Sequence, residues 1–425
     1  MNVLILTYGT RGDVQPYVAL GQGLKRAGHC VTVSTSSRFS ETIKAAGLNY
    51  AFMNDGMLRL LDAPEGKGAL EDTNNIFQIV KRTLGLLTKI GPIQRALVDE
   101  SWAAAKQCKP DIIVFHPKAF IAPDIAEKLG IPVLMALVVP GLVPTAEYPN
   151  MIMPQLRLGG WYNKLSYSFV NQLIRLSVAK HARAWRKANH LPKAKSFNLL
   201  QNADGTPIPV IHGYSNMVLP RPNDWPQTAS ICGYWHADDD QDYKPSPELS
   251  AFLEAGPLPV YVGFGSMTGR DPERLASIVI EALQRAGVRG ILATGWGGMK
   301  IKALPKEIIA VDHVPHSWLF PRVCGVVHHG GAGTTAAALR AGKASVVIPF
   351  FGDQPFWGNR VHSLNVAAAP IPFKKLTVDR LVAAIKEITT NQSIIDHAAE
   401  LGAKLREERG VEKAVAAIES LVDEP

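Results

Sequence analysis

The sequence HHGGAGTTAAALRAGKASVVIPFFGDQPFWGNR occupies residues 328–360 and begins where an apolar segment ends. A glycine turn comes first, then a helical segment with almost no polar side chains, and then the strand-like run SVVIP. Apolar strands that alternate with helices are typical of a parallel sheet covered by helices on both faces. The stretch therefore predicts an α/β fold.

The same alternation extends over both halves of the chain. Its strand-like segments are NVLIL, CVTVST, DIIVFH and PVLMALVV in the first half, and PVYVGFG, GILATG and CGVVHH in the second. A chain of 425 residues is too long for one core, since a domain usually holds about 100–200 residues. We expect two doubly wound, Rossmann-like domains that face each other across a cleft. Their predicted bounds are 1–235 and 250–405, with a polar linker at 236–249 and a C-terminal helix at 406–425 that can cross back to the N-terminal domain.

Composition excludes several classes of protein. A hydrophobic fraction of 47% excludes a disordered chain. The four cysteines form no CxxC pair, so neither a zinc ribbon nor a disulfide framework is predicted, which fits a reducing cytoplasm. No segment has the roughly 18 apolar residues of a membrane-spanning helix. We expect a cytoplasmic protein that can be peripheral at a membrane surface.

The net charge of +8 is unevenly distributed. Residues 148–203 contain no Asp or Glu, and within them the segment 157–195 mixes nine cations with tryptophan, tyrosine and phenylalanine. That mixture suits contact with anionic lipid head groups and apolar chains. A solvated helical face over an ordinary core is the alternative. Nucleic acid ranks third, because no recognised binding module accompanies the charge.

The glycine turn predicts an anion site. Backbone N–H groups at a helix N-terminus lack partners, and glycines at 330, 331 and 333 would let a phosphate approach the main chain. A tight turn that needs glycine only for its dihedral angles is the alternative. The Walker and GxGxxG patterns are absent, which disfavours ATPase and nicotinamide chemistry. The acidic run ADDDQDY lies in the predicted linker, so no metal site is expected there.

Together with GTRGDVQPYVALGQGLKRAGH, FGSM, GWGG and HVPHSWLFPRV, the stretch resembles the nucleotide-sugar signature of family 1 glycosyltransferases. These enzymes have the GT-B fold, and the resemblance is strongest to the sterol 3-beta-glucosyltransferase branch. It spans most of the chain. It implies an inverting UDP-dependent hexosyltransferase that moves glucose from UDP-glucose to a hydroxyl of a sterol or similar lipophilic acceptor. UDP-glucose would be a co-substrate, and neither a metal nor another cofactor is expected.

The resemblance also assigns donor-binding residues. The diphosphate contacts are Ser266, His329, Gly331, Gly333 and Thr334. Asp353 and Gln354 match the pair that binds the hexose hydroxyls, Val314 matches a main-chain contact to the base, and Trp296 can stack on that base. Plant members carry Trp at the position of His313 and a ribose-binding Glu at that of Ala337, so this chain must recognise the nucleoside differently.

Two residues are candidates for the catalytic base. Asp13, in GDVQP, occupies the position of a histidine that removes the acceptor proton in plant relatives, and an N-cap role is its alternative. His116, at the end of DIIVFH, falls on the same sheet edge and can orient, relay or substitute for Asp13, or be structural. Three other functions stay open: a broad-range transferase for flavonoids, polyketides or terpenoids, a UDP-sugar 2-epimerase, and a non-catalytic nucleotide-sugar or lipid-binding protein.

Overall fold

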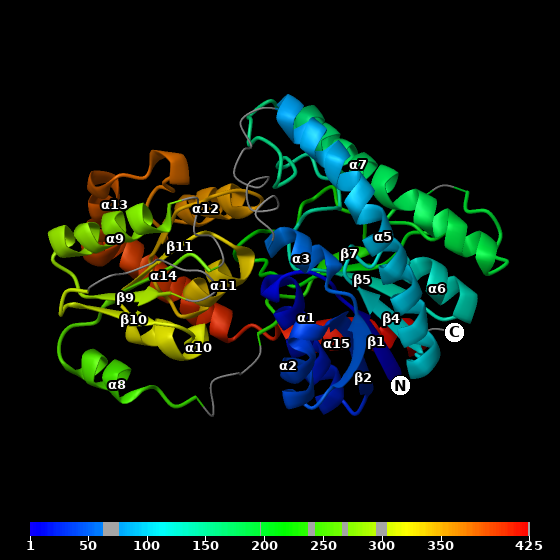
Figure 1. Cartoon of the computed structure of the whole chain (residues 1–425), viewed down its shortest axis with the longest axis horizontal. Coiled ribbons are helices and arrows are strands. Elements are labelled where there is room, and N and C mark those ends of the chain that lie inside the picture. Colours follow the sequence, from blue (N-terminus) through cyan, green and yellow to red (C-terminus); the bar gives the residue numbers. More distant parts are fainter. Residues whose placement is uncertain (63–75, 196, 237–242, 266–270, 295–303, 424–425) are drawn as a thin grey trace. The chain divides into compact units, whose positions relative to one another are not determined.

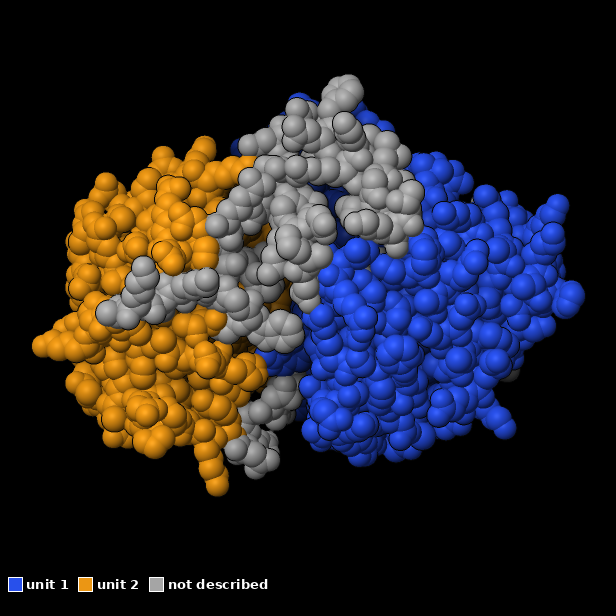
Figure 2. All heavy atoms as spheres, in the orientation of Figure 1, with its two compact units in different colours: residues 1–216, 220–237, 409–425 blue, residues 217–219, 238–408 orange. Residues whose placement is uncertain are grey.

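A computed structural model of the chain describes residues 1–62, 76–195, 197–236, 243–265, 271–294 and 304–423 (Figure 1). It divides into two compact units (Figure 2). Unit 1 comprises Met1–Asn216, Pro220–Ala237 and Arg409–Pro425, and unit 2 comprises Met217–Leu219 and Asp238–Glu408. The last residues of the chain therefore belong to the same unit as the first.

Unit 1 is built on a seven-stranded sheet in the order β3-β2-β1-β4-β5-β6-β7, and every pairing in it is parallel. Val3 and Ile5 of β1 pack on one face of the sheet with α1 and α15, so by alternation Leu4 and Leu6 fill the opposite face, where α5 lies. The strands are β1 (Asn2–Leu6), β2 (Cys30–Ser36), β3 (Asn49–Met53), β4 (Ile112–Phe115), β5 (Val133–Leu137), β6 (Val210–His212) and β7 (Ala229–Ile231).

Helices cover both faces of this sheet. They are α1 (Arg11–Arg26), η1 (Ser37–Phe39), α2 (Ser40–Ala45), α3 (Gly56–Asp62), α5 (Ile76–Cys108), α6 (Ala122–Leu129), α7 (Gly160–Ala188) and α15 (Gly410–Asp423). The C-terminal helix α15 packs on α1 and adds Val411, Ala414 and Ile418 to the core. Gly23 permits this approach, because a Cβ there would overlap Val411.

Unit 2 holds a five-stranded parallel sheet in the order β10-β9-β8-β11-β12. Its strands are β8 (Val260–Gly263), β9 (Gly290–Ala293), β10 (Ile308–Val311), β11 (Gly325–His328) and β12 (Ser345–Val347). Its helices are α8 (Pro247–Glu254), α9 (Pro272–Ala286), α10 (His316–Leu319), η2 (Phe320–Arg322), α11 (Ala332–Arg340), α12 (Gln354–Ser363), η3 (Phe373–Lys375), α13 (Val378–Thr390) and α14 (Gln392–Arg406).

Local sequence explains where these helices begin and end. The side chain of Asp271 accepts a hydrogen bond from Arg274 N at 2.9 Å and caps α9, and Pro272 follows at the first helical position. Gly287 ends the helix in the left-handed region, with φ of 71°.

The two parallel sheets confirm the prediction of two doubly wound α/β domains.

Candidate active site

The strand order of unit 1 reverses direction between β1 and β4, which both lie at the centre of the sheet. Ligands of such sheets bind outside the carboxyl ends of the strands at this switch point. Asp13 stands in the first turn of α1, which follows β1, and His116 is the residue directly after β4. The structure therefore brings the two predicted catalytic residues to the switch point, with His116 Nε2 3.4 Å from Asp13 Oδ1.

Asp13 caps helix α1 and also belongs to a cluster with His116 and Lys118. Its Oδ2 accepts hydrogen bonds from the backbone N of Thr10 at 2.8 Å and from Lys118 Nζ at 3.0 Å. The first bond is half of a capping box at the start of α1. Its side chain remains 21% exposed, so the carboxylate can still be reached from outside. The capping alternative and the functional one are thus compatible.

The hydrogen bonds of His116 select one tautomer of its buried ring. Nδ1 accepts from the backbone N of Lys118 at 3.1 Å, so the neutral ring carries its hydrogen on Nε2, which faces Asp13. The ring of Tyr17 packs edge-on against the imidazole with centroids 6.0 Å apart, and its hydroxyl donates to Ala136 O at 2.5 Å. His116 is thus held in a fixed orientation toward the carboxylate.

The charges of the cluster follow from burial and from Lys118. Burial raises the pKa of the Asp13 carboxyl, but the Lys118 ammonium and His116 outweigh it and hold that pKa well below its usual range. Burial also lowers the pKa of His116, more than its hydrogen bond with the Asp13 carboxylate raises it. At neutral pH the cluster is therefore a carboxylate beside a neutral imidazole and a lysine.

Two supporting residues were missed by reasoning from sequence. Lys118 lies two residues after His116, in the loop at the carboxyl end of β4, and its position in that loop was the available signal. Gly9 lies under the cluster with φ of 146°, and a Cβ there would overlap Asp13 Oδ2 and stand 2.7 Å from Lys118 Nζ. A side chain at residue 9 would displace the Asp13 carboxylate or the Lys118 ammonium from this position.

Unit 2 repeats this topology at the glycine turn. Its strand order reverses between β8 and β11, and the turn follows β11. Gly331 is the N-cap of α11, and Gly333 and Thr334 lie in the first turn of that helix. A Cβ on Gly333 would meet no atom of the described residues within 4 Å, so their packing does not require glycine there. The hydroxyl of Thr335 is not placed to donate to a phosphate, because it donates to Gly331 O at 3.0 Å.

His329 stands over this helix N-terminus. A Cβ added to Gly331 would be 2.6 Å from His329 Nε2, and one added to Gly265, after β8, would be 3.7 Å from His329 Cε1. Its Nδ1 is buried and has no hydrogen-bond partner among the described residues. Burial lowers the pKa of His329 to about 4, so the ring is neutral at pH 7 and can donate one hydrogen bond to an anion.

Asp353 and Gln354 mark the start of α12, beside the glycine turn. A Cβ on Gly330 would lie 3.1 Å from Gln354 O, and Gly330 adopts φ of 89°. Asp353 is partly exposed, and its Oδ2 accepts from Trp357 Nε1 at 3.0 Å. Gln354 is buried, with Oε1 accepting from Phe350 N at 2.7 Å, which leaves its amide nitrogen as the group that could donate to a ligand.

Of the other predicted donor residues, the structure describes only Val314. Val314 lies in the loop after β10, partly buried against the hydrophobic core of unit 2. Ser266, Trp296 and the acidic run at 238–240 lie outside the described residues. Within the described part of the chain no group of three or more His, Cys, Asp or Glu side chains is arranged to hold a metal ion.

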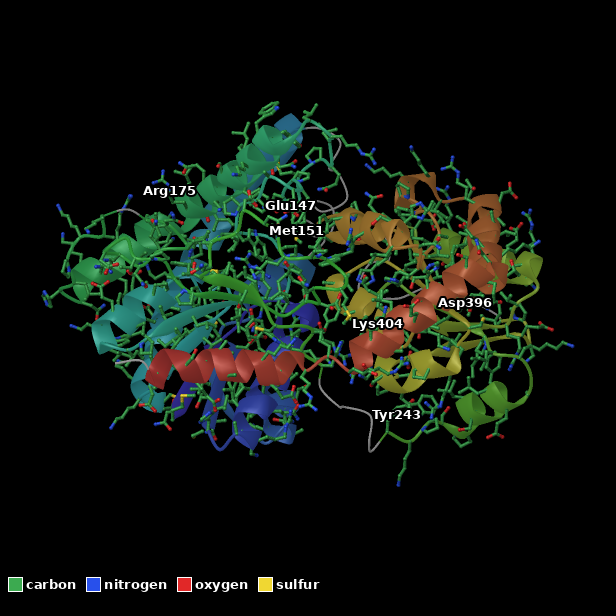
Figure 3. All side chains as sticks on the ribbon, turned by 180° about the vertical axis from the view of Figure 1, so that it is seen from behind. Glu147, Met151, Arg175, Tyr243, Asp396 and Lys404 are labelled. Atoms are coloured by element: carbon green, nitrogen blue, oxygen red, sulfur yellow. The ribbon has the colours of Figure 1, made fainter. Side chains whose placement is uncertain are left out.

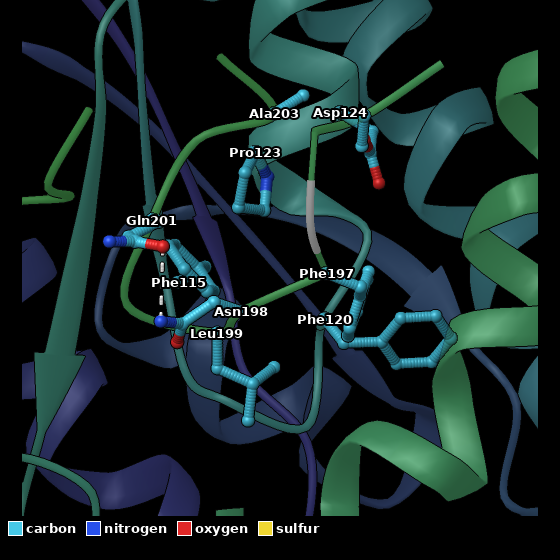
Figure 4. Close-up of a pocket in the computed structure, with 10 residues that line it drawn as sticks. Phe115, Phe120, Pro123, Asp124, Phe197, Asn198, Leu199, Gln201 and Ala203 are labelled. Atoms are coloured by element: carbon cyan, nitrogen blue, oxygen red, sulfur yellow. Dashed lines mark hydrogen bonds between the residues drawn. The ribbon is translucent and has the colours of Figure 1, made fainter. Parts of the chain in front are cut away.

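A separate small cavity lies in unit 1 (Figure 4). Its walls are Phe115, Phe120, Pro123, Asp124, Ala194, Phe197, Asn198, Leu199, Gln201 and Ala203. Asp124 pairs with Arg186 at 2.6 Å, and its burial raises the pKa of its carboxyl to about 6. None of the predicted site residues lines this cavity.

Comparison with known proteins identifies related families for both units. Residues 3–147 match the glycosyltransferase family 28 N-terminal domain, and residues 291–418 match the erythromycin biosynthesis protein CIII-like C-terminal domain. The sterol 3-beta-glucosyltransferase UGT80A2 of Arabidopsis thaliana is 36% identical over 98% of this chain. A sterol 3-beta-glucosyltransferase of Yarrowia lipolytica is 35% identical over the same share. The chain spans 65% of the plant relative and 28% of the fungal one.

Solved structures share the fold at low identity. The glycotransferase of kitacinnamycin superposes with a TM-score of 0.73 at 19% identity, covering 99% of this chain and 98% of that one. Glycosyltransferase VinC, solved with dTDP, gives 0.68 at 18% identity and covers both chains fully, with 100% of each. The predicted GT-B fold and the resemblance found in the sequence motifs are thus confirmed. The chain has the GT-B fold, matches a glycosyltransferase family model in its N-terminal part, and is similar over almost its whole length to sterol 3-beta-glucosyltransferases.

Proposed function

We propose that this protein transfers glucose from UDP-glucose to a hydroxyl of a sterol or similar lipophilic acceptor, with inversion at the sugar carbon. The observation that carries the proposal is the contact between Asp13 and His116 at the switch point of unit 1. A carboxylate there, partly exposed and held by neighbours, suits removal of a proton from an acceptor hydroxyl. Similarity to the sterol enzymes supports the acceptor class and glucose as the sugar.

Asp13 is the base in this proposal, and His116 positions it. Lys118 N donates to His116 Nδ1, so His116 Nε2 already carries a hydrogen and points it at Asp13. Nε2 therefore cannot accept the proton of the acceptor hydroxyl. The acceptor hydroxyl gives its proton to the Asp13 carboxylate while its oxygen forms the bond to the anomeric carbon. The bond from that carbon to the diphosphate oxygen breaks on the opposite side, and UDP leaves with the electron pair.

The glycine turn of unit 2 would hold the donor diphosphate. Backbone N–H groups at the start of α11 and the neutral His329 ring can donate to phosphate oxygens, and they can stabilise the charge that develops on the leaving group. In this proposal that charge needs no metal. Asp353 and the amide nitrogen of Gln354 would bind the sugar hydroxyls from the start of α12.

A broad-range natural-product transferase is the second candidate. The donor nucleotide is tested with it, because VinC and SsfS6, two glycosyltransferases that share the fold, were solved with thymidine diphosphate. The test is nucleotide release by the purified protein from UDP-glucose and from dTDP-glucose. Each donor is offered with a sterol in detergent, with a flavonoid, and alone, and products are identified by mass. A sterol hexoside formed from UDP-glucose supports the proposal. Transfer only to the flavonoid favours the second candidate, and release without an acceptor indicates epimerase or hydrolase chemistry.

A further inference from the structure

Helix α7 has an exposed apolar side along its first four turns. Five large apolar side chains recur there at intervals of three or four residues, so they follow one side of the helix. Their exposed fractions run from 51% to 66%, for Trp161, Leu165, Phe169, Leu173 and Leu176. Isolated exposed apolar residues are common on proteins, but a continuous row of this length indicates a contact surface.

The same side of α7 becomes cationic in its last turns. At 100° per residue, Lys180, Arg183 and Lys187 continue the row that Leu176 ends, and all three are exposed. We call the five apolar residues and these three cations the α7 outer face. Residues 148–203 contain no acidic residue, so no carboxylate within the helix or its flanks neutralises this face.

The opposite side of α7 accounts for its place in the fold. Tyr167, Val170, Val178 and Ala182 are buried there, and α7 runs alongside α5 (Figure 1). Arg175 projects from the helix in the view from behind (Figure 3). Because a separate set of side chains packs α7 onto unit 1, the outer face is not required for that packing.

The segment before α7 extends the exposed apolar surface. Ile152, Leu156 and Leu158 are 58%, 51% and 50% exposed, and the exposed Arg157 lies between the last two. Apolar side chains beside cations match the two layers of a bilayer surface. The apolar groups can enter the boundary of the acyl chains while the cations meet anionic head groups.

We propose that the α7 outer face binds the surface of an anionic lipid bilayer, with the helix lying in the plane of the interface. Charge selects this partner over a second copy of the chain. A second copy would present the same face, which has three cations and no carboxylate to pair with them. The inference rests on this face alone and holds whatever the acceptor proves to be.

The experiment is flotation of the full-length protein with vesicles of phosphatidylcholine, with and without about a third of phosphatidylglycerol. The apolar variant combines Leu165→Gln, Phe169→Gln and Leu173→Gln, and the charge variant combines Lys180→Gln, Arg183→Gln and Lys187→Gln. The matched control combines Phe52→Gln and Leu258→Gln, which remove side chains that are 52% and 51% exposed elsewhere. Circular dichroism and thermal unfolding verify that each variant is folded.

We expect wild type and control to float with anionic vesicles and to release at high salt. Each cation contributes about fivefold in affinity at such a surface, so the charge variant should bind about a hundredfold more weakly. The apolar variant should lose roughly as much. Absence of wild-type binding to anionic vesicles, or equal binding by the apolar variant, overturns the proposal. So does a wild-type dimer in light scattering that the apolar variant abolishes, because a second copy would then cover the face.

Discussion

Asp13 shows how one side chain can serve both the fold and the site. Its Oδ2 completes the capping box of α1 and pairs with Lys118, whereas its Oδ1 faces His116. Sequence reasoning could place Asp13 and His116 on one sheet edge, because both follow central strands. It did not single out Lys118, because a position in the loop after β4 does not by itself say whether the lysine side chain turns toward Asp13.

Replacing the proposed base should separate catalysis from binding. Asp13→Asn should lower kcat by about 10²–10⁴, the usual contribution of a positioned acid or base. The variant should fold, because the asparagine oxygen can still accept the bond from Thr10 N. Steady-state transfer assays and calorimetric titration with UDP measure the two properties. Near-normal turnover would remove Asp13 from the role of base.

Lys118 should set the pH at which the cluster loses activity. Lys118→Met removes the cation that holds the Asp13 pKa down, so burial is opposed less and that pKa rises. Protonation of Asp13 then occurs at higher pH, and the acid limb of the kcat/KM profile should move upward. Lys118→Arg keeps the charge and should keep the wild-type profile. Identical acid limbs in wild type and the Met variant would contradict the account.

His329 should act in donor binding. His329→Ala removes a neutral donor whose Nδ1 has no hydrogen-bond partner in the described part of the chain. A hydrogen bond to a charged group contributes about 1.5–3 kcal/mol, so UDP affinity should fall about tenfold to a hundredfold. Calorimetry with UDP measures the change, and an unchanged affinity would refute the diphosphate role.

Among the helices and strands, the sequence predicted those with a strong local pattern. The predicted helix near 272–286 matches α9, and PVYVGFG and CGVVHH contain β8 and β11. The strands β6 and β7, with three residues each, were not predicted. The equally short β12 was predicted because the glycine turn and the helical segment before it mark a strand–helix–strand pattern. The composition revealed that residues 157–195 mix cations with aromatic side chains, but only the fold decides which side of α7 is buried.

The first turn of α11 gives a test in which stability and binding should diverge. Gly333→Ala adds a methyl group that meets no atom of the described part of the chain within 4 Å, and alanine favours helix by up to about 1 kcal/mol. The variant should therefore be as stable as wild type or slightly more so. UDP affinity should nevertheless fall at least about tenfold, because the methyl occupies space where the phosphate approaches the backbone. Equal UDP affinity in calorimetry would remove Gly333 from the site.

Across the whole molecule, each unit buries a neutral histidine in its core. His212 in unit 1 and His328 in unit 2 are both 0% exposed. Burial lowers the pKa of His212 to about 4, and burial with the nearby His329 lowers the pKa of His328 to about 3, from 6.5. Below pH 6.5 the unfolded chain therefore binds protons that the folded chain does not, and the free energy of unfolding falls as pH falls.

Each of these histidines should cost its unit about 2 kcal/mol of stability between pH 7 and pH 5. Urea unfolding at the two pH values measures the total loss. His328→Asn should reduce that loss in unit 2, because an asparagine oxygen can accept the bond from Gly330 N and does not titrate. A loss of the same size in the variant would show that His328 is not responsible.

The return of α15 to unit 1 has a consequence for how the protein is made. Unit 1 contains both Met1–Asn216 and Arg409–Pro425, and between them the chain must build nearly all of unit 2. Val411, Ala414 and Ile418 belong to the same core as the first strand. During translation the amino-terminal sheet therefore emerges early, and the surface of α1 stays uncovered until residues 409–425 have been synthesised.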